Sequence, residues 1–176
     1  MRKYVLNWEM SGIVFVFLLG ALLHFIFEWS DESRIIGLFA SVNESVWEHF
    51  KQGFWPMVIY AAIEYRFLSG RINNFFTAKA VAVYLIPSIT GLVFYGYTAI
   101  IGKEILIVDI LIFLVAIIIG QLTSYRIMTS ARLHKYTNLI SLIFIILLAS
   151  ALILFTFYPP HLPIFIDGNT AMYGIP

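Results

Sequence analysis

The chain has 176 residues, of which 61% are hydrophobic and 12% are charged, with a formal net charge of +1. A soluble domain carries about 25% charged residues, so a mean hydropathy of +0.90 excludes a soluble globule and indicates an integral membrane protein. The small net charge, without a basic run, gives no support for nucleic-acid binding. The absence of cysteine excludes a disulfide framework and a thiol nucleophile.

Five segments are long and apolar enough to cross about 30 Å of hydrocarbon as helices. They are residues 8–29, 50–68, 77–101, 105–125 and 136–158. The first is too long for a signal peptide and no small-residue cleavage pattern follows it, so we expect it to be retained. We therefore predict an all-α polytopic membrane protein, a bundle of five transmembrane helices forming a single domain over residues 1–176, with the lipid bilayer as its main partner.

Lysine and arginine are distributed unevenly between the two sides of this predicted bundle. Five spans place eight of the eleven basic residues on one side: Arg2, Lys3, Arg66, Arg71, Lys79, Arg126, Arg132 and Lys135. The other side has Arg34, Lys51 and Lys103. Because basic residues favour the cytoplasmic side, we expect a protein of the cell membrane with its amino terminus in the cytoplasm and its carboxyl terminus outside.

The outer connection, residues 30–49, runs into an unusually polar stretch, SVNESVWEHFKQ, at 41–52. Ser41 followed three residues later by Glu44 fits a capping box, which predicts a helix that begins near residue 42 and continues into the second span. On such a helix Glu48 is placed to pair with Lys51 at i+3.

The tail, residues 159–176, is too short and too rich in proline to form a sixth span, and Asp167-Gly168-Asn169 is a turn signal. It is nevertheless apolar, whereas a tail free in water would be polar. We expect it to fold back as an irregular segment that caps the outer face of the bundle. This would bring His161 or Asp167 towards the polar stretch.

Histidine and carboxylate side chains gather on the predicted outer side. His24 and Glu28 share a helix face at i and i+4 near the end of the first span, where an ionisable residue is a candidate for function. Such groups bind zinc, manganese or iron, and a catalytic zinc needs three ligands and an open position. The candidate metal ligands are His24, Glu28, Glu48, His49 and His161, and the supporting polar cluster is Asn43, Glu44, Lys51 and Asp167.

Three functions remain open from these residues. The first is binding of a divalent metal or a small polar ligand at the outer face. It would extend to hydrolysis of a lipid or other envelope substrate if the metal keeps an open position, with Glu28 or Glu48 as the catalytic base. The second is a structural or partner-binding subunit whose polar cluster is a buried hydrogen-bond network. The third, transport, needs polar groups through the bilayer, and the fourth span has none from Ile110 to Ile119.

The stretch NESVWEHFKQGFWPM at 43–57, with HFIFEW before it and YPPHLPIF and YGI near the end, resembles a family of small bacterial membrane proteins. That family is described only as a domain of unknown function. The resemblance covers most of the chain and implies a compact multi-span protein of this length, without an assigned activity, cofactor or substrate.

Overall fold

The computed structural model describes residues 1–175, and the regular structure in this part of the chain is helical. The only β-type pairing in it is an isolated bridge between Ile166 and Tyr173. Pro176, the last residue of the expected tail, lies outside the described residues. The helices are α1 (Arg2–Trp29), η1 (Ile36–Leu38), α2 (Val46–Leu68), α3 (Phe75–Ile101), α4 (Leu106–Met128), α5 (Thr137–Phe157) and η2 (Pro163–Phe165).

The five expected spans correspond to the five long helices. Four of them, α1, α3, α4 and α5, are long and apolar enough to cross a membrane, which confirms an all-α chain with several helices of membrane-spanning character. The predicted limits were closest for α3 and α5, whereas α1 begins at Arg2, six residues before the expected start at residue 8. The remaining helix, α2, is less apolar because it carries Glu48, Lys51, Glu64 and Arg66.

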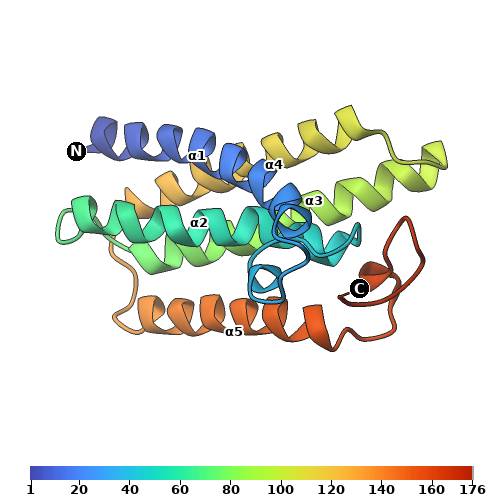
Figure 1. Cartoon of the computed structure of the whole chain (residues 1–176). Coiled ribbons are helices and arrows are strands. Elements are labelled where there is room, and N and C mark those ends of the chain that lie inside the picture. The colour runs from blue at the N-terminus through green and yellow to red at the C-terminus, as the bar shows by residue number, and fades with distance from the viewer. Residues whose placement is uncertain (176) are drawn as a thin grey trace.

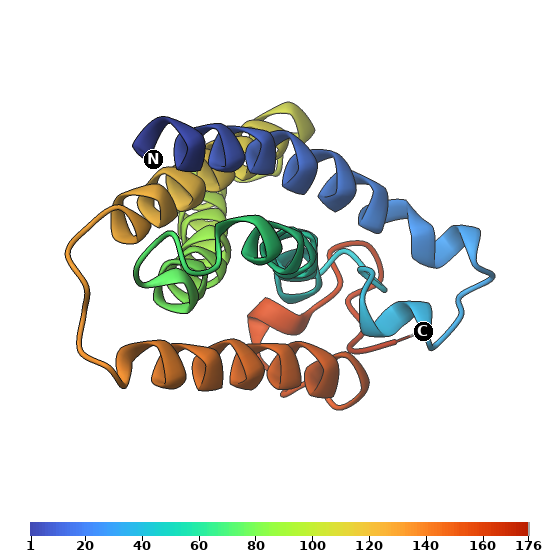
Figure 2. The same ribbon diagram turned by 90° about the vertical axis from the view of Figure 1, so that its left-hand side faces the viewer.

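Helix α2 occupies the middle of the bundle, with α1 and α5 on opposite sides of it (Figures 1 and 2). It contacts α1, α3 and α5, and α3 forms a long antiparallel pair with α4. Gly102 ends α3 in the left-handed conformation at φ +80°, which glycine adopts without steric cost. The core between the helices includes Val16, Phe54, Met57 and Ile86.

One close approach between helices sets the position of the polar stretch. A Cβ atom at Gly20 on α1 would lie 2.6 Å from the backbone oxygen of Gln52 on α2, which is too close for carbon and oxygen. Small residues permit this kind of backbone contact in membrane helices. His24 lies one helical turn further along α1, and the contact at Gly20 therefore brings it alongside the first turns of α2.

The start of α2 differs from the prediction. The helix begins at Val46 rather than near residue 42, and Ser45 is its N-cap, with the Ser45 hydroxyl accepting a hydrogen bond from the Glu48 N–H at 3.3 Å. The capping box assigned to Ser41 and Glu44 was therefore wrong. Ser45 and Glu48 have the same spacing, and the Glu44 N–H donates instead to the Asp167 side chain at 3.2 Å. The residues before Ser45, including Glu44, are therefore not part of the helix, and Glu44 is bound to the tail instead.

Helix α5 is the least buried of the five, with only Ser141, Leu152 and Thr156 buried along it. It packs mainly against α3 and also contacts α2. The chain after α5 turns back so that η2 packs against α2, where the ring of Phe165 lies 4.9 Å from that of Trp47. The carboxyl-terminal end lies beside the connection between α1 and α2 (Figure 1).

Candidate functional site

Three side chains from separate segments converge where α1, the start of α2 and the connection between them meet. His24, Glu44 and His49 each offer a metal-ligating atom, and these atoms all lie within 4.8 Å of one another. The Nε2 atoms of His24 and His49 lie 3.7 Å and 3.3 Å from different oxygens of the Glu44 carboxylate. Among the described residues this is the one such group of three.

Each of the three residues is positioned by a different part of the fold. His24 lies on the last turns of α1, and His49 lies in the first turn of α2. Glu44 precedes α2 and is fixed by the hydrogen bond of its N–H to Asp167. The centres of the two imidazole rings are 5.2 Å apart. All three side chains keep some exposure, 26% for His24, 31% for His49 and 41% for Glu44, so the cluster is open to solutes.

The orientation of the His49 ring is set by the backbone. Its Nδ1 lies 2.8 Å from the carbonyl oxygen of Ser45, which can only accept, so Nδ1 carries a proton. The other ring nitrogen, Nε2, faces Glu44. A histidine held in this way by a backbone carbonyl presents Nε2 as the metal-binding atom.

A chain of hydrogen bonds that runs through Gln52 and Ser41 connects His24 to the backbone of Glu48. The Gln52 Nε2 lies 3.1 Å from Ser41 Oγ and 3.0 Å from His24 Nδ1, and the Ser41 hydroxyl donates to the Glu48 carbonyl at 3.1 Å. In this arrangement the Gln52 amide donates to His24 Nδ1, which leaves the proton of a neutral ring on Nε2. A 180° turn of the amide would make its oxygen the acceptor and free Nε2 for a metal.

Glu44 is ionised more readily than an ordinary glutamate. The hydrogen bond from His49 lowers the pKa of Glu44, while partial burial acts in the opposite direction and the nearby histidines lower it further. The carboxylate is therefore available as an anionic ligand at neutral pH.

Glu48, which the sequence analysis proposed as ligand or base, lies in a separate buried network. Its Oε2 accepts from Lys51 Nζ at 2.7 Å and from the Val42 N–H at 3.2 Å, and its Oε1 accepts from Thr156 at 2.9 Å. Lys51 Nζ also donates to the carbonyls of Gly37 and Ala40. The predicted pair of Glu48 with Lys51 is confirmed, and it holds the residue 37–42 connection to α2 and α5.

Asn43 and Asp167 join the same segment to the tail. The Asn43 side chain donates to the Gly174 carbonyl at 2.7 Å, and its oxygen accepts from the Ser45 N–H at 2.9 Å. Asp167 Oδ1 accepts from Glu44 and from Asn169. The pKa of Asp167 is lowered, because hydrogen bonds from Thr170, Asn169 and Glu44 together outweigh the opposing effect of burial.

The other two proposed ligands lie outside the converging group. His161 is exposed and its ring packs on Tyr173, with 4.7 Å between ring centres. Glu28 is exposed on α1, one helical turn beyond His24. Of the five proposed ligands, the structure brings together His24 and His49, and it adds Glu44, which sequence reasoning had placed only in the supporting cluster.

A second ionisable centre lies at the opposite end of the bundle, and sequence reasoning missed it. Glu9 on α1, Glu64 on α2 and Lys79 on α3 are all buried and paired through Lys79. The sequence signal was the occurrence of these charges inside apolar segments. No spacing along the chain related them, because they come from three helices.

A model of a family of unknown function (DUF6512) matches residues 2–175, and the chain belongs to this family. The match confirms the expected resemblance to a family without an assigned activity. No curated protein and no solved structure matches the chain.

Proposed function

We propose that the chain is a multi-pass membrane protein that binds a divalent transition-metal ion through His24, Glu44 and His49. The observation that carries the proposal is the convergence of three ligand atoms within 4.8 Å. These atoms come from α1, the 30–45 connection and α2.

The spacing of the cluster fits a metal of this class. A tetrahedral zinc site with bonds of about 2.0–2.1 Å places neighbouring ligand atoms about 3.4 Å apart. The contacts of His49 and His24 with Glu44 are 3.3 Å and 3.7 Å. Metal binding in this geometry requires His24 to move inward and the Gln52 amide to turn so that His24 Nε2 is free of its proton.

The ligand types favour zinc, with manganese or iron as the next choices. Two imidazoles and one carboxylate match the His₂Glu set of catalytic zinc sites, which keeps a fourth position open. The same set in a facial arrangement binds iron. The partial exposure of all three side chains supports access of a small polar or lipid ligand to that open position.

The proposed membrane arrangement has five spans: the four helices that are apolar enough to cross a membrane, and α2 in addition. Its central position and the pairing of its buried charges, Lys51 with Glu48 and Glu64 with Lys79, support a crossing despite its lower hydropathy. The basic residues near the amino terminus and near the α2–α3 and α4–α5 connections favour a cytoplasmic location for that end. The metal cluster would then face the outside of the cell membrane, beneath a cap formed by residues 159–175.

Hydrolysis is the extension of this proposal. We place the catalytic base at Glu28 rather than Glu48, because Glu28 is exposed and one turn from His24. Both oxygens of Glu48 already accept hydrogen bonds from protein groups. A base must be free to take a proton from its substrate.

The competing function is a structural or partner-binding subunit without a metal. The network around Glu48 and Lys51 favours this structural function, since all three N–H groups of Lys51 have acceptors within the protein. The two functions predict different effects of replacing the histidines on metal content and on stability. A purely structural cluster would lose stability without its histidines and would contain no metal.

The test is elemental analysis of the detergent-purified protein, alone and after incubation with Zn²⁺ and dialysis. We expect one zinc per chain in the wild type and in the matched control His161→Ala, and none in His24→Ala/His49→Ala or Glu44→Gln. Absence of metal from the wild type, with the double variant less heat-stable, would reject the metal site and support the structural subunit.

A further inference from the structure

The buried centre formed by Glu9, Glu64 and Lys79 is independent of the proposed metal cluster. Lys79 Nζ lies 2.8 Å from Glu9 Oε1 and 2.5 Å from Glu64 Oε2. Ser124 on α4 donates to the same Glu9 oxygen at 2.7 Å. Glu9 and Glu64 are fully buried and Lys79 is 1% exposed. Four helices therefore contribute to one centre that is closed to bulk water.

The formal charges of this centre do not balance. Two carboxylates face one ammonium group, and among residues 1–175 no other basic side chain forms an ion pair with either carboxylate. With all three groups ionised the centre carries a net charge of −1. An uncompensated charge in a buried site is strongly unfavourable, and such a site recovers neutrality by taking up a positive charge.

The structure also shows where that charge can be held. Glu9 Oε2 and Glu64 Oε1 are buried without a hydrogen-bond partner, as are both polar atoms of the Gln121 amide, and Gln121 is fully buried. Gln121 lies on α4 one turn from Ser124, and its amide nitrogen lies against Gly12, one turn from Glu9. Unpaired buried polar atoms are rare and each requires an explanation.

We propose that Glu9 and Glu64 share one bound proton, taken from solvent, so that the centre holds one neutral carboxylic acid, one carboxylate and one ammonium. The proton bonds to one of the two carboxylate oxygens that lack a partner. A proton fits better than a metal cation, because Lys79 already fills the position between the carboxylates at 2.8 Å and 2.5 Å.

Two other polar neighbours of the centre, Tyr60 and Ser124, do not supply the missing positive charge. Tyr60 on α2, one turn from Glu64, uses its hydroxyl to donate to the Trp8 carbonyl at 2.5 Å, so it does not supply the missing proton. Ser124 donates to Glu9 Oε1, which Lys79 already contacts. Neither neighbour neutralises the second carboxylate.

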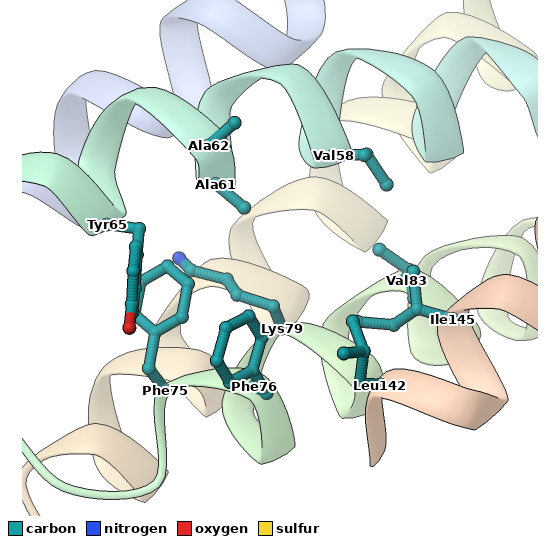
Figure 3. Close-up of a pocket in the computed structure, with 10 residues that line it drawn as sticks. All are labelled: Val58, Ala61, Ala62, Tyr65, Phe75, Phe76, Lys79, Val83, Leu142 and Ile145. Atoms are coloured by element: carbon teal, nitrogen blue, oxygen red, sulfur yellow. The ribbon is translucent and has the colours of Figure 1, made fainter. Parts of the chain in front are cut away.

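A cavity of about 330 Å³ between α2, α3 and α5 borders this centre at Lys79. Apart from Lys79, its walls are formed by hydrophobic and aromatic side chains, among them Val58, Phe76 and Leu142. Figure 3 shows Lys79 extending alongside Phe75 and Phe76 in the wall of this cavity. Lys79 therefore belongs both to the wall of this cavity and to the buried centre.

Charge balance makes the test quantitative: the number of bound protons equals the number of carboxylates minus the number of ammonium groups. Infrared spectroscopy of the purified protein at neutral pH, in H₂O and D₂O, detects the C=O stretch of a protonated carboxyl. We expect one such group per chain in the wild type and none in Glu9→Gln or Glu64→Gln, because the remaining carboxylate then pairs with Lys79. Glu104→Gln, which changes an exposed glutamate, is the matched control and should keep the band.

Lys79→Met should raise the count to two if it folds, and the two glutamine variants decide the question if it does not. A wild type without the band, or a band that survives unchanged in both glutamine variants, overturns the proposal. A band that disappears when sodium chloride replaces choline chloride also overturns it, because a metal cation would then occupy the centre. All outcomes are independent of zinc binding at the histidine cluster.

Discussion

The side-chain amide of Asn43 donates a hydrogen bond of 2.7 Å to the backbone carbonyl of Gly174, although 131 positions separate the two residues. Gly174 has a φ of +78°, where residues with a Cβ atom are strained. Together with the contact between Glu44 and Asp167, this bond fastens the tail to the segment that carries one of the three converging side chains.

Asn43→Ala should loosen the tail. The variant loses a partly buried hydrogen bond, which is worth about 1 kcal/mol, and it also removes the acceptor of the Ser45 N–H. We expect a lower melting temperature and faster protease cleavage within residues 159–175. Asn73→Ala, which removes an exposed bond to Ser130 at the opposite end, is the control. Equal cleavage of both variants would show that the Asn43 bond does not hold the tail.

Lys51→Met should be among the most damaging single substitutions in the chain. It leaves Glu48 buried without its cation, and removing one partner of a buried pair costs about 3–5 kcal/mol. Glu48→Gln/Lys51→Met should recover much of this loss, because no charge is left unpaired. Thermal unfolding of the wild type, Glu48→Gln, Lys51→Met and the double variant measures the coupling. Zinc bound per folded chain should stay constant, and its loss in Glu48→Gln would return Glu48 to the ligand set.

Gln52→Glu should strengthen metal binding at the histidine cluster. A carboxylate at this position can only accept, so it fixes the His24 proton on Nδ1 and frees Nε2 for the metal. Changing a partner of a metal ligand alters affinity by about 10–100-fold. We therefore expect a gain of this order for Gln52→Glu and a loss for Gln52→Met, measured by zinc titration. The reverse order would place the metal on other atoms of His24 or exclude it.

Acid should release the tail through Asp167. The pKa of Asp167 is lowered in the fold from its ordinary value of 3.8, so the folded protein binds this proton less readily than the unfolded chain. Its contribution to stability is present above the ordinary pKa and is lost as the pH falls through the lowered value. Protease cleavage within residues 159–175 should increase over this range. Asp167→Asn should show greater cleavage already at neutral pH and a smaller change with acid.

The sequence predicted the helices more reliably than the contacts between them. Long apolar runs can be recognised from local composition alone, without knowledge of which segments are in contact. All five expected segments correspond to helices. The start of α2 was misjudged because Ser41 and Ser45 both precede a glutamate by three residues. Contacts with residues far along the chain, such as that of Glu44 with Asp167, accompany the start at Ser45 and cannot be derived from the spacing.

The candidate site was predicted in part. His24 and His49 were named as candidate ligands because an ionisable residue near a membrane boundary is a candidate for function and because the polar stretch around His49 holds more groups than helix capping requires. Glu44 was assigned to capping, and Glu48 was preferred as a ligand although its oxygens face Lys51, Val42 and Thr156. Which carboxylate turns towards the histidines depends on side-chain packing between segments, which a one-dimensional pattern does not encode.

The charge distribution also looks different in three dimensions. Lys79 and Lys51 were counted as basic residues of opposite sides, yet both are buried and paired with glutamates. Without these two lysines the bias is seven basic residues against two, so the expected orientation does not depend on them.

The low burial of α5 has a mechanical consequence for the cluster. The helix that is held least firmly by its neighbours is also the one to which residues 158–175 are tethered. It is tied to the start of α2 by Thr156, whose hydroxyl donates to Glu48. The tail that follows α5 in turn contacts Asn43 through Gly174 and Glu44 through Asp167. The histidine cluster is therefore connected to the least buried helix by two routes, the hydrogen bond from Thr156 to Glu48 and the contacts of the tail with Asn43 and Glu44.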